Sequence, residues 1–349
     1  MKTTLAVKYR PKSFKELIGQ EYIKEVLQNQ IKNNNLGKSY LYTGPSGVGK
    51  TTVARIFASN IDSEVIEIDA ASNSGVDNVR SISENAKYKP LNNNYKVYII
   101  DECHMLSKGA WNALLKILEE PPKHVIFILA TTEPHKVPTT IISRSQRFNF
   151  TKPSKHLIQE NLLNISKSEN FKVKDSVLSY ISKLADGGVR LSITMLEACM
   201  NVEQEINVEE VEKVLGHIPT KYFIEILEAV SLRDREKIFT LVNKYHYEGL
   251  DFNRFTEQIV MFVLDLHKYA VTRDMQYLRT SSMYEDDIKD ILNNLVKDLD
   301  NNVEKLQRML DYILKSLTYL YYSSFKLEPK RYLLECVLID LTKIKKDSL

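Results

Sequence analysis

Eight consecutive residues, Gly44-Pro45-Ser46-Gly47-Val48-Gly49-Lys50-Thr51, have the types and spacing needed to hold a nucleoside triphosphate. They match the pattern G-x-x-x-x-G-K-[ST], in which glycines let successive backbone N–H groups turn toward phosphate oxygens. The lysine of this pattern reaches the β- and γ-phosphates, and the hydroxyl that follows it binds Mg²⁺. This phosphate loop, residues 44–51, therefore predicts ATP and Mg²⁺ as ligands, with a further contact from Thr52.

The segments that flank the phosphate loop support this interpretation. Residues 39–43 have the pattern of a buried strand, and residues 52–58 have that of a helix. A helix that begins at the loop directs the positive end of its dipole toward a bound anion. With every fixed position of the motif present between a strand and a helix, a chance glycine-rich turn is a poor explanation.

A second motif is the apolar run at residues 97–100, which is followed by Asp101 and Glu102. Asp101 is suited to hold Mg²⁺, directly or through water, and Glu102 to orient or deprotonate an attacking water. Apolar strands that end in acids are common, but one that follows a phosphate loop indicates a nucleotide site. The adjacent Cys103 and His104 lack the spacing of metal ligands, so we expect His104 to be a structural histidine.

Two further polar residues could complete such a site. The apolar run at residues 126–130 is followed by Thr131 and Thr132, and Thr132 could sense the γ-phosphate. Arg144 follows a short predicted helix and could project outward. An exposed arginine is usually only solvated, but one can also complete the ATP site of a neighbouring subunit. The residues by themselves leave both interpretations of Arg144 open.

Composition and charge exclude several classes of protein. The 349 residues are 43% hydrophobic and 27% charged, as in ordinary globular proteins, and the length predicts two or three domains. The net charge of +3 permits a nucleic-acid partner without arguing for one. We expect no membrane partner, because no apolar run spans a bilayer. Three widely separated cysteines fit a cytoplasmic location and predict neither disulfides nor a cysteine zinc site.

The order of the predicted elements indicates the fold class. Short β-branched runs at 65–68, 97–100 and 125–129 alternate with amphipathic stretches, which predicts an α/β fold with a parallel sheet between two layers of helices. After Pro153 the pattern is helical. Helices are expected at 154–168, 174–185, 190–199 and 207–215, and almost without a break from 221 to the end.

We therefore expect three domains: 1–153, which binds the nucleotide, a small helical domain at 154–216, and an all-α domain at 217–349. The last domain shows no residues that suggest chemistry. Its aromatic stripe is expected to lie in the core rather than at an interface, because aromatic stripes on helices usually pack internally. The stripe comprises Tyr319, Tyr321, Tyr322 and Phe325.

Taken together, these residues resemble the AAA+ clamp-loader ATPases, with the gamma/tau subunits of bacterial DNA polymerase III as the nearest match. The set of matching stretches is specific, although the phosphate loop alone is not. The helical remainder matches only in length and helicity. The matching stretches are residues 8–11 with Phe14 and 18–20, then 69–72, 101–107, 112–116, 118–122, 130–136, 143–145 and 186–190.

The resemblance implies a role for individual residues. Thr132 would be sensor 1, and Arg190 would be sensor 2, which reaches the γ-phosphate from a lid domain at 154–216. Arg144 matches the arginine of the family's Ser-Arg-Cys motif, which acts on the ATP of the adjacent subunit. The residues that would line the adenine pocket are Tyr9, Arg10, Pro11 and Ile18.

The resemblance also implies an assembly and its partners. Five subunits would form an open spiral through a helical collar at 217–349. ATP would close the spiral on a sliding clamp and primer-template DNA, and hydrolysis would release both. DNA contacts are expected on phosphates. The candidates are Lys108, Asn73 and Arg80, and the clamp would bind residues 87–94 or the helix that follows Asn73.

The chain departs from the family pattern in four respects. Ser145 replaces the usual cysteine, which leaves the arginine finger intact, and Leu191 replaces an aspartate, which puts the positioning of the lid in question. The family's four-cysteine zinc module is missing between residues 60 and 65, so no zinc is expected. The chain also ends near the collar, without the family's polymerase-binding tail. We expect a compact form, encoded by a phage or another reduced replicon.

Two other functions share parts of this pattern. An AAA+ branch-migration or remodelling motor would use the same nucleotide-binding residues but would translocate DNA. A scaffold subunit would bind nucleotide without hydrolysing it. The presence of Lys50, Thr51, Asp101 and Glu102 argues against the scaffold.

Overall fold

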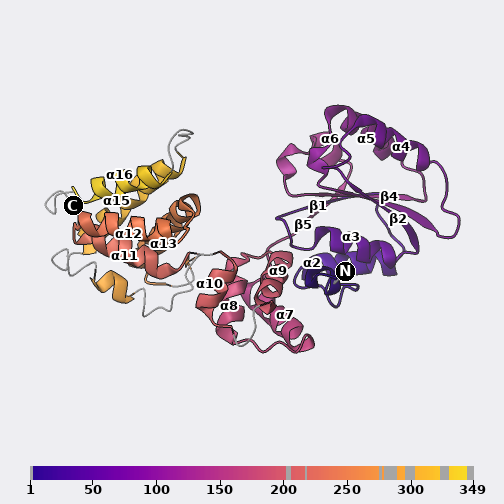
Figure 1. The fold of residues 1–349 in the computed structure, drawn as a ribbon. Helices are drawn as coiled ribbons and strands as arrows, with labels where there is room; N and C mark the ends of the chain where they lie inside the picture. The colour runs from indigo at the N-terminus through magenta and orange to yellow at the C-terminus, as the bar shows by residue number, and fades with distance from the viewer. Residues whose placement is uncertain are drawn as a thin grey trace. The chain divides into compact units, whose positions relative to one another are not determined.

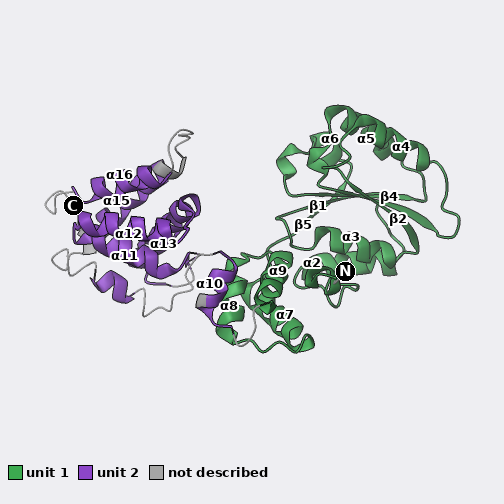
Figure 2. Cartoon of the chain, in the orientation of Figure 1, with its two compact units in different colours: residues 1–205 green, residues 206–349 purple. Residues whose placement is uncertain are grey.

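The computed structural model describes residues 3–201, 206–216, 218–274, 277–278, 289–294, 303–322 and 330–343 (Figure 1). The chain forms two compact units, residues 1–205 and residues 206–349 (Figure 2). The division into three domains stays a prediction.

The first unit is an α/β structure followed by three helices. Its strands are β1 (Ser39–Thr43), β2 (Ser63–Asp69), β3 (Tyr95–Asp101), β4 (Val125–Thr131) and β5 (Gln146–Asn149). Its helices are α1 (Leu5–Lys8), α2 (Glu21–Lys32), α3 (Lys50–Ser59), α4 (Val76–Asn85), α5 (Lys108–Glu119), α6 (Thr139–Ile142), α7 (Lys155–Ser168), α8 (Asp175–Leu184) and α9 (Val189–Met200). Two 3₁₀ turns, η1 (Cys103–Met105) and η2 (Pro134–Lys136), follow β3 and β4.

The five strands form one parallel sheet with the order β2-β3-β4-β1-β5. The predicted α/β fold class is thereby confirmed. Because the strands are parallel, their carboxyl ends lie at one edge of the sheet, where ligands bind in such folds. At this edge β1 leads into the phosphate loop, β3 ends at Asp101 and β4 ends at Thr131. Since β4 lies between β1 and β3, the sheet order brings the three predicted motifs together.

Helices cover both faces of the sheet because alternate strand residues point to opposite sides. On one face, Tyr40 and Tyr42 of β1 belong to a core that includes Val53 and Phe57 of α3. On the other face, Leu41 belongs to a core with residues of α4 and α5. Figure 1 shows α2 and α3 on the first side and α4, α5 and α6 on the second. This double layer holds the carboxyl edge of the sheet rigidly.

Side-chain caps mark the starts of two of the predicted helices, α7 and α10. The Ser154 side chain accepts a hydrogen bond from the backbone N–H of Leu157 at the start of α7. Asn207 forms a capping box with Glu210 at the start of α10 (Val208–Val214). Such caps satisfy backbone N–H groups that have no partner in the first helical turn. All four helices predicted from residue 154 to 215 begin and end within one or two residues of the observed bounds, although α8 and α9 have no side-chain cap.

The edge strand β5 was not predicted. It is four residues long, and among them only Phe148 is buried. A strand that contributes one side chain to the core has no alternating apolar pattern to reveal it. It is held instead by its parallel ladder with β1.

The second unit consists of α10 and of longer helices that pack around one apolar core. These are α11 (Thr220–Ser231), α12 (Arg235–Tyr247), α13 (Phe252–Thr272), α15 (Val303–Tyr322) and α16 (Lys330–Leu341). In α15 the buried positions Leu310, Ile313 and Leu317 recur at helical spacing. None of the described helices is both long and apolar enough to cross a membrane.

The prediction that the aromatic stripe lies in the core is wrong for Tyr319 of α15, which is 74% exposed. Tyr319 follows the buried Leu317 by two positions, and a two-residue step turns a side chain away from the buried helix face. Phe325 and the side chains of Tyr321 and Tyr322 lie outside the described residues.

Candidate functional site

The phosphate loop adopts a conformation that its glycines permit. Gly44 has φ 149°, and a Cβ there would lie 2.4 Å from the backbone oxygen of Phe150. Gly49, with φ 104°, is the N-cap of α3. Both positions therefore exclude a side chain, the first by close approach and the second by backbone conformation. The loop ends on the N-terminus of α3, where the free backbone N–H groups favour an anion.

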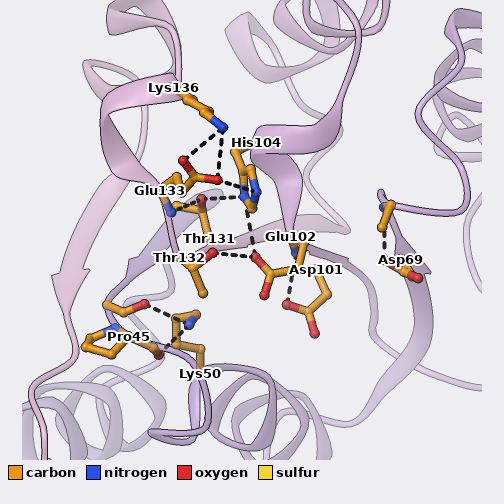
Figure 3. Close-up of polar contacts among 12 residues, drawn as sticks. Pro45, Lys50, Asp69, Asp101, Glu102, His104, Thr131, Thr132, Glu133 and Lys136 are labelled. Carbon is orange, nitrogen blue, oxygen red and sulfur yellow. Dashed lines mark hydrogen bonds and ion pairs between the residues drawn. The ribbon is translucent and has the colours of Figure 1, made fainter. Parts of the chain in front are cut away.

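Lys50 is buried at the start of α3, and its ammonium group points into the phosphate loop (Figure 3). Its Nζ donates hydrogen bonds to the backbone oxygens of Gly44, at 2.9 Å, and Pro45, at 2.8 Å. Burial lowers the pKa of Lys50, and the nearby carboxylates of Glu102 and Asp101 act in the opposite direction. A cation held in this way can exchange its two carbonyl acceptors for phosphate oxygens.

Thr51 and Asp101 meet at the carboxyl edge of the sheet. The Thr51 Oγ1 atom donates a hydrogen bond to Asp101 Oδ2 at 2.7 Å. The other carboxylate oxygen, Asp101 Oδ1, accepts the backbone N–H of Glu102 at 3.0 Å. A hydroxyl and a carboxylate oxygen are the hard ligands that Mg²⁺ prefers, so the pair fits the predicted metal site.

Glu102 and Thr132 are also in direct contact. Thr132 Oγ1 donates a hydrogen bond to Glu102 Oε2 at 3.0 Å, as Figure 3 shows. Glu102 has φ 46°, in the left-handed region that non-glycine residues seldom adopt. This conformation turns the chain between β3 and η1 and separates the side-chain directions of Asp101 and Glu102. The structure thus joins the candidate general base to the candidate sensor.

The His104 side chain lies next to these residues and is 7% exposed, and both of its ring nitrogens have polar neighbours. Its Nδ1 lies 3.1 Å from Thr131 Oγ1, and its Nε2 lies 3.2 Å from Glu133 Oε1. These contacts are those expected of a structural histidine. Within the described residues, no group of three or more His, Cys, Asp or Glu side chains is arranged to hold a metal ion.

A cavity of about 590 Å³ lies beside the phosphate loop. Its walls contain every residue predicted for the adenine pocket, together with Arg190 of the predicted lid. They also contain residues that sequence reasoning did not assign to the site, because these residues have no chemistry that a motif would reveal. The predicted group is Tyr9, Arg10, Pro11, Ile18 and Arg190, and the residues that were not predicted include Leu17, Asn161 and Ile193.

Positive charges gather around this cavity. The pKa of Arg10 is lowered, first by burial and then by the nearby charges of Arg55 and Arg190. Arg55 is neutralised by Glu67, which accepts hydrogen bonds of 2.7 and 2.6 Å from its guanidinium. An anion between Arg10 and Arg190 would relieve their repulsion. The electrostatics of the cavity therefore suit a polyphosphate.

Two of the three helices after Pro153, α7 and α9, contribute residues to the nucleotide cavity. The Arg190 backbone N–H donates to the backbone oxygen of Gly47 at 3.4 Å. Tyr9 Oη donates a hydrogen bond of 2.5 Å to Glu169, which follows α7. Residues of the N-terminal segment, the phosphate loop and the predicted lid therefore all line the same cavity. Leu191, which replaces the family's aspartate, is exposed.

Arg144 is not among the residues that line this cavity. Its Nη1 donates to the backbone oxygen of Thr140, and its Nη2 donates to Glu119 Oε1, both at 3.0 Å. The side chain is 38% exposed. The neighbouring Ser145 Oγ lies 2.8 Å from Ser39 Oγ. The structure thus places Arg144 on the surface, apart from the nucleotide-binding residues of its own chain.

The candidate DNA contacts lie near the start of α4 and α5. Lys108 is the first residue of α5, and Arg80 of α4 forms an ion pair with Asp77 at 3.2 Å. The Asn73 amide donates to the backbone oxygen of Asp69 at 3.1 Å. All three candidates are on the surface or partly exposed. Their contact with DNA stays a prediction.

Three family models match the chain. Residues 60–154 match "DNA polymerase III, delta subunit", residues 160–200 match "RCF1/5-like, AAA+ ATPase lid domain", and residues 206–346 match "DNA polymerase III subunits gamma and tau domain III". Together the three matches cover β2 to β5, most of the three helices after the sheet, and the helical unit, while β1 and the phosphate loop precede the first matched range.

Curated relatives match over most of the chain. DNA polymerase III subunit gamma of Buchnera aphidicola subsp. Schizaphis graminum is 34% identical over 91% of this chain and 93% of its own length. DNA polymerase III subunit tau of Bacillus subtilis is 34% identical over 88% of this chain. The chain spans 58% of that relative, and 50% and 45% of the gamma/tau subunits of Mycoplasma genitalium and Mycoplasma pneumoniae.

Among solved structures, the RuvB Holliday junction branch migration motor of Thermotoga maritima has a similar fold. The TM-score is 0.52 at 22% identity, over 64% of this chain and 79% of that one. At this identity the similarity concerns the fold alone.

Proposed function

Because the chain belongs to the family of DNA polymerase III gamma and tau subunits, we propose that it is an ATP-hydrolysing subunit of a clamp loader. In this proposal it opens a sliding clamp and loads it onto primer-template DNA during replication, with ATP hydrolysed at subunit interfaces. The partners would be other clamp-loader subunits, in an assembly of five, together with the clamp and the DNA. We propose that it acts in the cytoplasm, while a phage origin stays a prediction.

The observation that supports the proposal is that the candidate arginine finger lies apart from the other residues of the candidate ATP site. The phosphate loop, Asp101, Glu102 and Arg190 line one cavity, whereas Arg144 lies outside it. A chain that hydrolysed ATP by itself would need its arginine finger near that cavity. An ATPase whose sites are completed by a neighbour needs the finger on its surface, where Arg144 is 38% exposed.

The residues of the cavity suggest how binding would proceed. The adenine would lie among Tyr9, Pro11 and Ile18, and the phosphates would bind the loop N–H groups and Lys50. Mg²⁺, when bound between Thr51 and Asp101, would neutralise phosphate charge and hold the phosphates in line for attack.

Hydrolysis would then depend on residues from two chains. Glu102 would accept the proton of the attacking water, with Thr132 holding its Oε2 atom. Arg190 from the predicted lid would contact the γ-phosphate, and Arg144 of an adjacent subunit would stabilise the charge that develops. The helical unit, whose sequence matches the gamma and tau domain III, would form the oligomerisation collar.

An ATPase assay with matched mixtures tests the proposal. The chain is assembled with its partner subunits, and ATP turnover is measured alone, with primed DNA, with the cognate clamp and with both. Clamp loading predicts the largest stimulation when DNA and clamp are both present. Stimulation by DNA alone, with strand displacement, would indicate a remodelling motor. An absence of turnover in every mixture would indicate a non-hydrolysing scaffold.

A further inference from the structure

We propose that His104 is a positioning residue for Glu102, the candidate general base, an inference that rests on the proposed ATPase function. Glu102 has a flexible side chain, and general-base catalysis requires its carboxylate to stay within hydrogen-bond distance of the water that it activates. Thr132 fixes one oxygen, Oε2, by a hydrogen bond of 3.0 Å. One contact of this kind leaves rotation of the carboxylate open.

The His104 ring supplies the second restriction. Its Nδ1 lies 3.4 Å from Glu102 Oε2, the same oxygen that Thr132 binds. Figure 3 shows the ring between Glu102 and Glu133, with interactions to both. Because the ring and Thr132 both act on Oε2, the other oxygen, Oε1, is the one available to a water in the cavity that Glu102 lines. The steric part of this restriction does not depend on which ring nitrogen carries a proton.

The His104 ring can restrict the Glu102 carboxylate because neighbouring residues fix the position of the ring. Its side chain is 7% exposed, and its two nitrogens contact Thr131 Oγ1 and Glu133 Oε1. Thr131 is fully buried, and its hydroxyl also accepts the backbone N–H of Glu133 at 3.0 Å. Since a carboxylate only accepts hydrogen bonds, a ring nitrogen attracts the carboxylate that it faces only when that nitrogen carries a proton. Glu133 is in turn held by Lys136 at 2.9 Å.

These contacts extend the site beyond the nucleotide cavity. Glu133 precedes η2 and Lys136 is its last residue, in the segment that leads from Thr132 toward α6 and Arg144. The segment that carries the candidate sensor therefore also holds the His104 ring beside Glu102, the candidate general base. A structural histidine would only fill space and satisfy its own polar atoms, whereas a positioning residue must affect hydrolysis through Glu102.

The first test is His104→Ala in the assembly that hydrolyses ATP. We expect kcat to fall by about 10-fold, a part of the roughly 10²–10⁴-fold that general-base catalysis supplies. The dissociation constant for ATP, measured by nucleotide titration, should change by less than about 2-fold, because His104 does not line the cavity. An unchanged kcat, or weakened ATP binding that accounts for the whole loss of activity, would overturn the proposal.

A double-mutant cycle with Glu102→Gln separates positioning from structure. If His104 acts through Glu102, His104→Ala should cause less than about a 2-fold further loss in the Glu102→Gln background. A further loss as large as in the wild-type background would refute the proposal. Absence of turnover in the wild-type assembly would instead refute the proposed function, and the inference with it.

A second variant tests the same role in case His104→Ala does not fold. Glu133 is 36% exposed, so Glu133→Ala releases the ring without opening the core, and we expect a kcat loss of roughly 3-fold. The matched control is His135→Ala, because His135 also approaches Glu133, at 3.6 Å, but is 73% exposed. Equal effects of the Glu133 and His135 variants on kcat would contradict the proposed role of the ring.

Discussion

The substitution Arg144→Ala should abolish hydrolysis while leaving ATP binding and folding intact. An arginine finger contributes roughly 10³-fold or more to kcat, which corresponds to about 4 kcal/mol of transition-state stabilisation. The same side chain forms a half-exposed ion pair with Glu119, and such pairs contribute only about 0–1 kcal/mol to stability. The predicted loss of activity therefore far exceeds the predicted loss of stability.

Mixed assemblies show whether Arg144 acts on a neighbouring chain. Arg144→Ala subunits retain an intact nucleotide cavity, and Glu102→Gln subunits retain an intact finger. If the finger acts on the adjacent subunit, an ATP site is complete where an Arg144→Ala subunit supplies Glu102 and its neighbour, a Glu102→Gln subunit, supplies Arg144. In an equal mixture with random placement, about one quarter of all interfaces would have this arrangement.

The assay is steady-state ATP turnover of each variant alone and of equal mixtures, with primed DNA and clamp present. We expect both single variants to be nearly inactive and the mixture to regain measurable turnover. Thermal unfolding and ATP titration of Arg144→Ala provide the controls for fold and binding. Normal turnover by Arg144→Ala alone, or a mixture no more active than its components, would refute the reasoning from the position of Arg144.

Three further predictions follow from other parts of the structure. Lys50→Ala should abolish ATP binding, because the buried ammonium is the cation of the phosphate loop, and retained micromolar affinity in a titration would contradict this assignment. Burial raises the pKa of Tyr40 to about 12, above its ordinary value of 10.0. The folded state therefore holds this proton more tightly, and the stability present below pH 10 should be lost as the pH rises from about 10 to about 12. The melting temperature of Tyr40→Phe should fall less steeply over this range than that of the wild type, with the exposed Tyr88→Phe as control. Phe57→Ala should lower the free energy of unfolding, measured in urea, by about 3–5 kcal/mol. The reason is that Phe57 is fully buried and packs against Tyr40 at a ring-centroid distance of 5.1 Å. As the control, Tyr22→Ala at an exposed position should change the free energy of unfolding by less than about 0.5 kcal/mol.

The sequence predicted the elements that have a strong local signal. The buried strands around residues 41, 98 and 127 are mostly apolar, and the helices after Pro153 have apolar periodicity, with side-chain caps at α7 and α10. The edge strand β5 and the exposure of Tyr319 were not predicted. Both depend on which face of an element meets the core, and a single short segment does not reveal this.

For the candidate site, the sequence by itself determined the chemical groups. The phosphate loop, the acids after β3 and the threonines after β4 are readable because their backbone and charge requirements are local. Only the tertiary structure decided which of these groups meet. The strand order brings Thr51 to Asp101, Thr132 to Glu102 and His104 to Thr131. Arg144 lies on the surface beside Glu119. The physical reason is that parallel strands far apart in sequence share one edge, so contacts between their ends depend on strand order and not on any local pattern.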